Sequence, residues 1–189
     1  MAKSKKALKK SYLFEIEIPS EIESSLNGNV ITMKKNGKEL KKIINSKVTL
    51  KKEGNNLSLE VKNAGKRDKR EYGTAKSHIK NMIEGLMTGY EYELEICIVH
   101  FPMTVTYDKA KKEFVIKNLL GEKAPRVIKS RGDVEVQIKA PKITIKSYDL
   151  EAAGQTAADV EKITKIRNRD RNKFQDGIFI TKKPGIEYI

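Results

Sequence analysis

The sequence predicts an α+β protein of two tandem similar modules, each a small antiparallel sheet with a helix packed on one face. Three observations predict it. Short runs alternate apolar and charged residues with the period of a strand, and two longer segments place apolar residues with the period of a helix. The whole pattern then recurs at a spacing of about 84 residues, which is typical of an internal repeat.

A strand is expected to open each module, at 12–18 in the first and at 90–98 in the second. In the first run Phe14 and Ile16 alternate with glutamates, and the run stops at Pro19, which has no N–H to donate to a sheet. The second run alternates Tyr, Leu and Ile with glutamates and a cysteine in the same way. Both strands should bury one face and expose their glutamates on the other.

Further strands are expected after each opening strand. In the first module they cover 30–32, 48–50 and 57–61, and in the second module 114–116, 134–138 and 143–145. The turn Asn36-Gly37 is a strong hairpin signal, because both residues tolerate a positive φ.

One amphipathic helix closes each module. Ala75, Ile79, Met82 and Leu86 fall on one helical face, which predicts a helix over about 75–87. In the second module the helix is expected from about Thr156, with Ala157, Val160 and Ile163 on its apolar face. The predicted organisation is a basic N-terminal tail at 1–10, a first module at 11–88, a second module at 89–180 and a C-terminal tail at 181–189.

Charge gives the first indication of function. The chain has 39 Lys and Arg against 25 Asp and Glu, a net charge of +14, which favours a polyanionic partner, with nucleic acid ahead of an anionic membrane. No apolar run approaches the roughly 18 residues of a membrane span, so no membrane partner is expected. Cys97 is the single cysteine, which suits a reducing, cytoplasmic setting. The N-terminal lysines precede no apolar segment of the kind that a secretory signal needs.

The sequence indicates no catalytic site, no cofactor and no metal. His78 and His100 are interpreted as a helix-edge residue and a strand-end residue, because neither has a catalytic partner nearby in the sequence. A single cysteine excludes multi-cysteine zinc motifs, and no Gly-rich phosphate loop occurs. A small enzyme acting on an acidic substrate is the weakest alternative, since the sequence shows no cofactor motif or perturbed carboxylate for it.

Basic residues gather in several patches, and the densest covers 162–173, where six Lys or Arg residues accompany one carboxylate, Asp170. The predicted RNA-binding residues there are Lys162, Lys165, Arg167, Arg169, Arg171 and Lys173, together with Phe174. Two further predicted groups are Arg126, Lys129 and Arg131 in the second module, and Lys66, Arg67, Lys69 and Arg70 in a predicted loop of the first. Lys109–Lys112 is interpreted as a solvated turn. Arg predominates in the second module and aromatics are few, which favours recognition of the backbone and shape of largely double-helical RNA over base stacking.

The segment 154–179 resembles the closing motif of the large-ribosomal-subunit protein six family in its archaeal and eukaryotic form. In that motif an Arg/Lys-rich turn leads into Phe-x-Asp-Gly and a short apolar strand, here Phe174-Gln175-Asp176-Gly177 and Ile178-Phe179-Ile180. The sequence departs from it at Asn172, where a basic residue is expected. The Pro/Tyr/Gly/Lys-rich tail of the bacterial branch is missing, and without a long C-terminal extension the archaeal type is favoured.

The resemblance implies a duplicated fold and a structural role in the large ribosomal subunit. Members of that family bind large-subunit ribosomal RNA mainly through the second module, near the sarcin-ricin region and the stalk base, where translational GTPases dock. Other large-subunit ribosomal proteins are expected partners, and no homo-oligomer is expected. By resemblance the motif falls on Lys165, Arg167, Arg169, Arg171, Lys173 and Phe174, with Asp176 and Gly177 shaping the turn. The alternative is a free-standing basic RNA-binding or chaperone protein.

Overall fold

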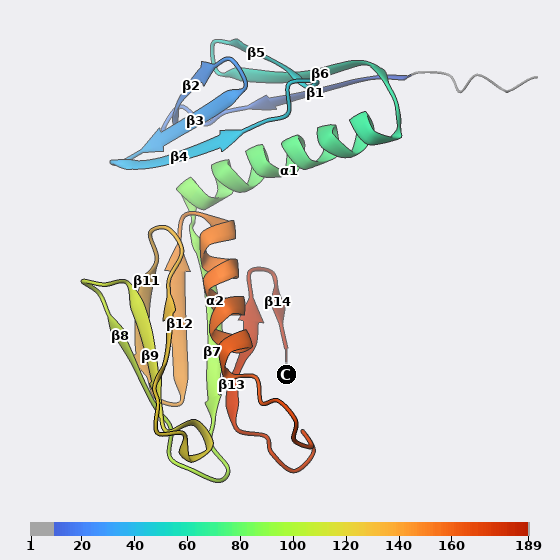
Figure 1. Cartoon of the computed structure of the whole chain (residues 1–189). Coiled ribbons are helices and arrows are strands. Elements are labelled where there is room, and N and C mark those ends of the chain that lie inside the picture. The colour runs from blue at the N-terminus through green and yellow to red at the C-terminus, as the bar shows by residue number, and fades with distance from the viewer. Residues whose placement is uncertain (1–9, 189) are drawn as a thin grey trace, which may run out of the picture. The chain divides into compact units, whose positions relative to one another are not determined.

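The computed structural model describes residues 10–188 of the chain, which divides into two compact units between Met87 and Thr88. We call them the first unit and the second unit (Figure 1). Lysines 3, 5, 6 and 9 of the predicted basic tail lie outside the described residues. Lys10 belongs to the first strand rather than to a tail.

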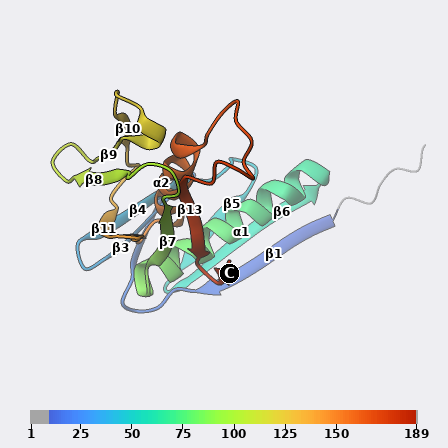
Figure 2. The same cartoon turned by 90° about the horizontal axis from the view of Figure 1, so that it is seen from below.

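The first unit contains two three-stranded antiparallel sheets and one helix. One sheet has the order β1-β6-β5, formed by β1 (Lys10–Glu17), β6 (Asn56–Ala64) and β5 (Thr49–Glu53). The other is the meander of β2 (Glu23–Asn27), β3 (Val30–Lys35) and β4 (Lys38–Ile43). The helix α1 (Lys66–Met87) contacts strands of both sheets, as the view from below also shows (Figure 2). Its apolar face meets a core that includes Ile31, Met33, Leu57, Leu59 and Ile79, all fully buried.

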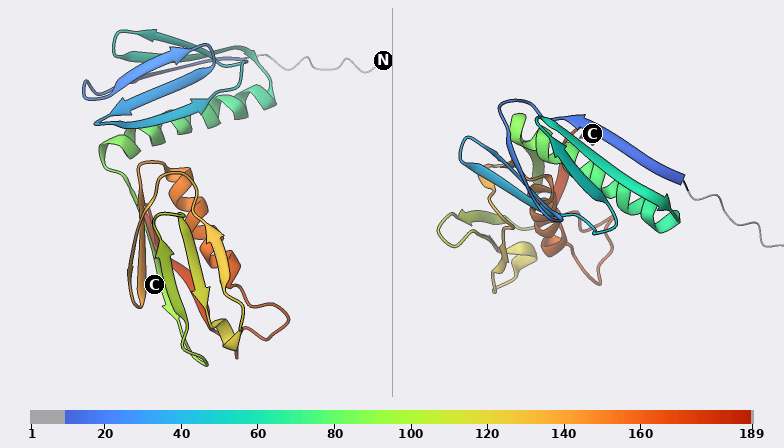
Figure 3. Two further views of the ribbon diagram at one scale, coloured as in Figure 1. Left: turned by 60° about the vertical axis from the view of Figure 1, so that its left-hand side comes forward. Right: turned by 90° about the horizontal axis from the view of Figure 1, so that it is seen from above.

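The second unit repeats this plan with additions. Its larger sheet has the order β11-β12-β7-β13-β14, and β10-β9-β8 form a smaller one. The strands are β7 (Tyr90–Cys97), β8 (Thr104–Asp108), β9 (Glu113–Lys117), β10 (Arg126–Lys129), β11 (Glu135–Lys139), β12 (Lys142–Ser147), β13 (Gly177–Lys183) and β14 (Ile186–Glu187), with a short 3-10 turn, η1 (Leu119–Gly121), after β9. The helix α2 (Leu150–Thr164) contacts β7, β12 and β13 (Figure 3).

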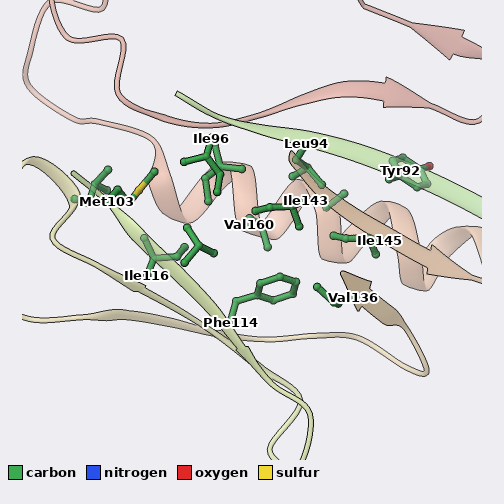
Figure 4. Close-up of a cluster of buried hydrophobic side chains, with 14 of the residues drawn as sticks. Tyr92, Leu94, Ile96, Met103, Phe114, Ile116, Val136, Ile143, Ile145 and Val160 are labelled. Atoms are coloured by element: carbon green, nitrogen blue, oxygen red, sulfur yellow. The ribbon is translucent and has the colours of Figure 1, made fainter. Parts of the chain in front are cut away.

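The core of the second unit lies between the two sheets and α2. Leu94 of β7, Ile143 and Ile145 of β12, Phe114 of β9 and Val160 of α2 are fully buried. Figure 4 shows these side chains gathered in the space between helix and strands. The alternation of apolar and charged residues in β7 therefore reports one buried face of this strand, as the sequence indicates.

The predicted α+β class with two similar sheet-and-helix arrangements is confirmed. In sequence order β1, the meander β2-β3-β4, the pair β5-β6 and α1 correspond to β7, the meander β8-β9-β10, the pair β11-β12 and α2. The predicted turn at Asn36-Gly37 joins β3 to β4, with φ of 50° and 77°. The flanking strands β2, β4, β8 and β10 were not expected, because each contains only one or two aliphatic residues and so shows little apolar alternation.

Both helices begin earlier than the apolar pattern predicts. The first starts at Lys66, so residues 66–70 form helical turns and the prediction of a loop there is wrong. The Gly65 backbone N–H donates to Asp68 Oδ2 at 3.0 Å, which holds the chain where the helix begins. The second starts at Leu150, and its N-cap Asp149 accepts from the Glu151 backbone N–H at 3.0 Å. Polar capping at the first turn extends each helix beyond its apolar stripe.

The expected C-terminal tail at 181–189 is part of a sheet for most of its described length. The strand β13 continues to Lys183 and turns into β14, where Lys182 pairs with Glu187 and Lys183 with Ile186. Lys182 Nζ also lies 3.3 Å from Glu93 Oε1 on β7. Cross-strand pairing therefore orders a segment whose sequence gives only a weak strand signal.

Candidate nucleic-acid interface

The segment between α2 and β13, residues 165–176, forms an irregular connection that we call the basic loop. Figures 1 and 3 show it projecting from the end of the second unit where α2 ends. Its five basic residues and Lys162, in the last turn of α2, are all at least partly exposed. Within residues 10–188 none of these six forms an ion pair with a carboxylate. Their charge is therefore not neutralised by the described part of the protein.

A buried hydroxyl holds the first end of the basic loop. Thr164, the last residue of α2, is 1% exposed. Its Oγ1 accepts a hydrogen bond from the Ile178 backbone N–H at 3.1 Å and lies 3.1 Å from the Glu161 carbonyl oxygen, to which it donates. The end of α2 is thereby tied to the start of β13, and the basic loop leaves and returns at neighbouring points.

A buried carboxylate holds the other end. Asp176 is 4% exposed, and its Oδ1 accepts from the backbone N–H groups of Val99 at 2.8 Å and His100 at 2.9 Å. His100 Nδ1 lies 2.6 Å from Asp176 Oδ2. Burial alone would raise the pKa of this carboxyl, but the hydrogen bonds from the His100 backbone and ring and from the Val99 backbone lower it to about 2. Asp176 is therefore an ionised anchor at neutral pH, consistent with a role in shaping the turn.

The interpretation of His100 as a strand-end residue is wrong. The strand β7 ends at Cys97, and His100 lies in the turn after it, where its ring reaches Asp176. Sequence reasoning missed the pair because 76 positions separate the two residues. The Phe-x-Asp-Gly motif draws attention to Asp176, but nothing in the sequence identifies His100 as its partner.

Gly177 allows the chain to enter β13 immediately after this anchor. Its φ is 151°, a conformation that side chains disfavour, and an added Cβ would lie 3.2 Å from Cζ of the Phe179 ring. The glycine of the motif therefore has a local reason: another residue would strain the backbone and press on Phe179.

The single carboxylate within the 162–173 patch, Asp170, accepts a hydrogen bond from the backbone. Asp170 Oδ1 accepts from the Asn172 N–H at 2.9 Å, and the Asp170 carbonyl accepts from the Phe174 N–H at 2.9 Å. Asp170 therefore closes a turn and does not ion-pair with its basic neighbours. Asn172, at the position where a basic residue is expected, lies exposed in this turn.

Two arginines of the basic loop lie against aromatic rings. The Arg169 guanidinium carbon is 4.8 Å from the centre of the Phe174 ring, and Phe174 stacks on His100 with ring centres 4.9 Å apart. The Arg171 guanidinium carbon is 5.7 Å from the centre of the Phe179 ring. Such contacts restrict an arginine's rotamers while leaving its N–H donors available. Phe174 therefore supports Arg169 within the loop.

Arg126, Lys129 and Arg131 differ from the basic loop, because each contacts a carboxylate. Arg126 Nε donates to Glu122 Oε2 at 2.8 Å, and its Nη1 donates to the Ile163 carbonyl in the last turn of α2. Arg131 Nε lies 2.8 Å from Asp159 Oδ2, and Lys129 Nζ lies 3.7 Å from Glu113 Oε1.

Arg126 also borders the basic loop that it helps to position. It lines a hollow of about 470 Å³ together with Lys162, Lys165, Arg167 and Arg169.

The remaining predicted residues, Lys66, Arg67, Lys69 and Arg70, occupy the first turns of α1 in the other unit. All four are exposed, and in the described part of the chain none is ion-paired with a carboxylate. These four residues lie on one helix of the first unit, whereas the basic loop belongs to the second unit.

Other chemistry receives no support from the described residues. Burial and then the charges of Glu95 and Asp176 raise the pKa of the Cys97 thiol, which keeps it protonated at neutral pH. Across residues 10–188 no three His, Cys, Asp or Glu side chains gather as a metal site would require. Neither α1 nor α2 combines the length and apolarity of a membrane-crossing helix.

Comparison with known proteins identifies the family. The family described as Ribosomal protein L6 matches residues 101–177, which include the basic loop. The large ribosomal subunit protein uL6 of Methanobrevibacter smithii is 42% identical over 170 residues, covering 89% of this chain and 94% of its own length. The uL6 proteins of Haloarcula marismortui and Staphylothermus marinus are 37% and 40% identical, with coverage of 90% and 88% of this chain and 95% and 91% of their own lengths.

These relatives match almost end to end, and each is archaeal. The resemblance in the segment 154–179 is therefore confirmed by the chain as a whole, including the preference for the archaeal type. The chain belongs to the ribosomal protein L6 family, in its archaeal form.

Proposed function

We propose that this protein is a structural constituent of the large ribosomal subunit and binds large-subunit ribosomal RNA, mainly through the basic loop of the second unit. One observation carries the RNA site: six cations without carboxylate partners in the described residues lie on or beside a loop that is anchored at both ends. The relatives' names, which assign them to the large ribosomal subunit, support the assembly.

The basic loop is suited to binding phosphates of folded RNA. Arginine presents a planar set of donors that matches a phosphate, and Arg167, Arg169 and Arg171 supply three such groups within five residues. Lys162 and Lys165 add charge at the carboxyl end of α2, where the helix dipole is negative. Because Phe174 is already stacked on His100, base stacking on this ring contributes little, and the backbone and shape of the RNA carry recognition.

In this role the protein makes or breaks no covalent bond. It holds RNA helices in register and neutralises their phosphates, together with neighbouring large-subunit proteins in the cytoplasm. The family resemblance supports a site near the sarcin-ricin region and the stalk base, so that translational GTPases dock nearby. The first-unit residues Lys66, Arg67, Lys69 and Arg70 form a second, weaker contact.

Salt-dependent binding tests the RNA site. Each phosphate contact contributes roughly 0.7 to 0.9 to the slope of log K against log salt, so Arg167→Ala/Arg169→Ala/Arg171→Ala should flatten the slope by about two to three units. The ligand is large-subunit ribosomal RNA of Methanobrevibacter smithii transcribed in vitro. A triple variant at Lys109, Lys111 and Lys117, all exposed in the same unit, removes equal charge and should change the slope by less than about one unit. Equal slopes for the two triple variants would refute this assignment.

Sedimentation tests the assembly. In a sucrose gradient of a native lysate the protein should migrate with the large subunit at one copy per particle and remain there after a moderate salt wash. A protein that stays at the top of the gradient would instead be the free-standing RNA-binding or chaperone alternative. Sedimentation is needed in addition to the salt-dependence measurement, because a free-standing RNA-binding protein would also bind RNA in a salt-dependent way.

A further inference from the structure

An exposed apolar turn lies next to the basic loop. Between β7 and β8, the side chains of Ile98, Val99 and Phe101 are 50%, 59% and 48% exposed. We call residues 98–101 the apolar tip. Single exposed apolar residues are common on protein surfaces, but three among four consecutive residues form a local patch that costs solvation free energy unless a ligand covers it.

The apolar tip has a fixed position relative to the basic loop. The backbone N–H groups of Val99 and His100 both donate to the buried carboxylate of Asp176, and the His100 ring stacks on Phe174. Figure 3 shows the two segments at the same end of the second unit. The tip and the loop therefore present one preformed surface, so little conformational entropy is lost when a ligand contacts both.

A hollow of about 510 Å³ lies where the tip and the basic loop meet. Ile98, Val99 and Phe179 supply apolar walls, while Arg171 and Gln175 supply polar groups. Glu95 is the one acidic residue among the lining residues, and it comes from β7. The hollow therefore combines apolar side chains with an arginine that has no carboxylate partner in the described residues, which suits a ligand with apolar faces bordered by anionic groups.

We propose that the apolar tip packs on the sugar faces of an RNA minor groove, while the arginines of the basic loop bind the phosphates that border that groove. This inference rests on the proposed function and adds to it an uncharged contact. The minor groove of A-form RNA is wide and shallow and presents ribose groups, whose C–H faces are apolar, between two rows of phosphates. Ile98 and Val99 would lose their exposure to water there, and Arg171 would lie at the groove edge.

Removing the apolar side chains without touching charge tests the proposal. In Ile98→Ser/Val99→Ser the backbone N–H of Val99 still donates to Asp176, and both side chains are about half exposed, so folding should be retained. Binding to the Methanobrevibacter smithii transcript should weaken about tenfold, because burial of two aliphatic side chains is lost. The slope of log K against log salt should stay unchanged, because no phosphate contact is removed.

A matched control is Leu13→Ser/Ile43→Ser in the first unit, where the replaced side chains are 63% and 79% exposed. This variant should bind the RNA as the wild type does. Thermal unfolding of each variant checks the fold, and Val99→Ser alone serves if the double variant is unstable.

The outcomes separate this inference from the proposed function. Unchanged RNA affinity of the tip variant, with a flattened slope for the arginine triple variant, would overturn the tip proposal and leave the RNA site intact. Normal RNA affinity combined with loss from the large subunit would assign the tip to a protein neighbour and also overturn it. An unaltered slope in the arginine triple variant would count against the proposed function itself.

Discussion

The two units share their strand order and helix but differ in the segment that comes after the helix. After α1 the chain passes through two residues, Thr88 and Gly89, and begins β7 of the next unit. After α2 it forms the basic loop, returns as β13 along the free edge of β7 and ends in β14. In the described residues β1, the counterpart of β7, pairs with β6 alone.

The added segment is where the candidate site lies, so the shared fold and the binding surface can be separated. The duplicated part buries its apolar faces in both units without needing a basic loop. In the second unit Thr164 ties one end of that loop to β13, and Asp176 ties the other end to the turn after β7. A repeat of structure therefore does not imply a repeat of function, and substitutions at corresponding places should affect the units differently.

The largest expected effect is at the buried anchor. Asp176→Ala leaves the N–H groups of Val99 and His100 without their acceptor, and it should lower the free energy of unfolding by about 3 kcal/mol. In the first unit, Asp68→Ala removes an acceptor at the exposed start of α1 and should destabilise the protein clearly less than Asp176→Ala does. Urea unfolding followed by circular dichroism measures both. Equal losses would mean that the loop anchor is no more important to folding than a helix cap.

Acid should affect the second unit first. The folded pKa of Asp176 is about 2 against an ordinary 3.8, so its stabilisation is fully present above about pH 4 and is lost as the pH falls toward 2. The loss is on the order of 2 kcal/mol. Hydrogen exchange read by mass spectrometry, with each rate divided by the intrinsic exchange rate at that pH, should show less protection at pH 3 than at pH 5 in peptides around 98–100 and 176–180. A uniform loss of protection across both units would argue against Asp176 as the cause.

Comparing Arg126→Ala with Arg167→Ala tests which arginine supports the fold and which binds phosphate. Arg126→Ala removes the hydrogen bonds to Glu122 and to the Ile163 carbonyl, and it should destabilise the protein by about 1 to 2 kcal/mol. The salt slope for RNA binding should change by less than about 0.5, because Arg126 is already paired. Arg167→Ala should do the reverse, with stability unchanged and a slope flatter by about 0.7 to 0.9. A full unit of slope lost in Arg126→Ala would place Arg126 on the RNA.

The smallest effect is expected from the first unit. Replacing Lys66, Arg67, Lys69 and Arg70 by Ala removes four charges, yet the salt slope should change by less than about one unit if the second unit is the main binding module. Filter binding at several salt concentrations measures this beside the arginine triple variant. A larger change here than in the basic loop would reverse the assignment of the modules.

Much of the fold was predictable from the sequence because local patterns report burial. The alternation in 12–18 and 90–98 and the apolar stripe around Ile79 and Leu86 identify segments with one buried face. Helix starts were missed because Asp68 and Asp149 act through capping, which carries no apolar pattern. The strand β13 was predicted too short, because its second half is ordered by pairing with β7 and β14.

The sequence by itself determined the duplication, the family resemblance and the concentration of positive charge at 162–173, because each is a property of neighbours along the chain. Only the tertiary structure decided which cations are unpaired. Arg131 looks like Arg167 in the sequence, but folding brings Asp159, which is 28 positions away, to Arg131 and brings no carboxylate of the described chain to Arg167. It also joined His100 to Asp176 and placed Val99 beside the basic loop. Two charges neutralise each other only when they lie within a few ångströms in space, and their separation along the chain does not indicate that distance.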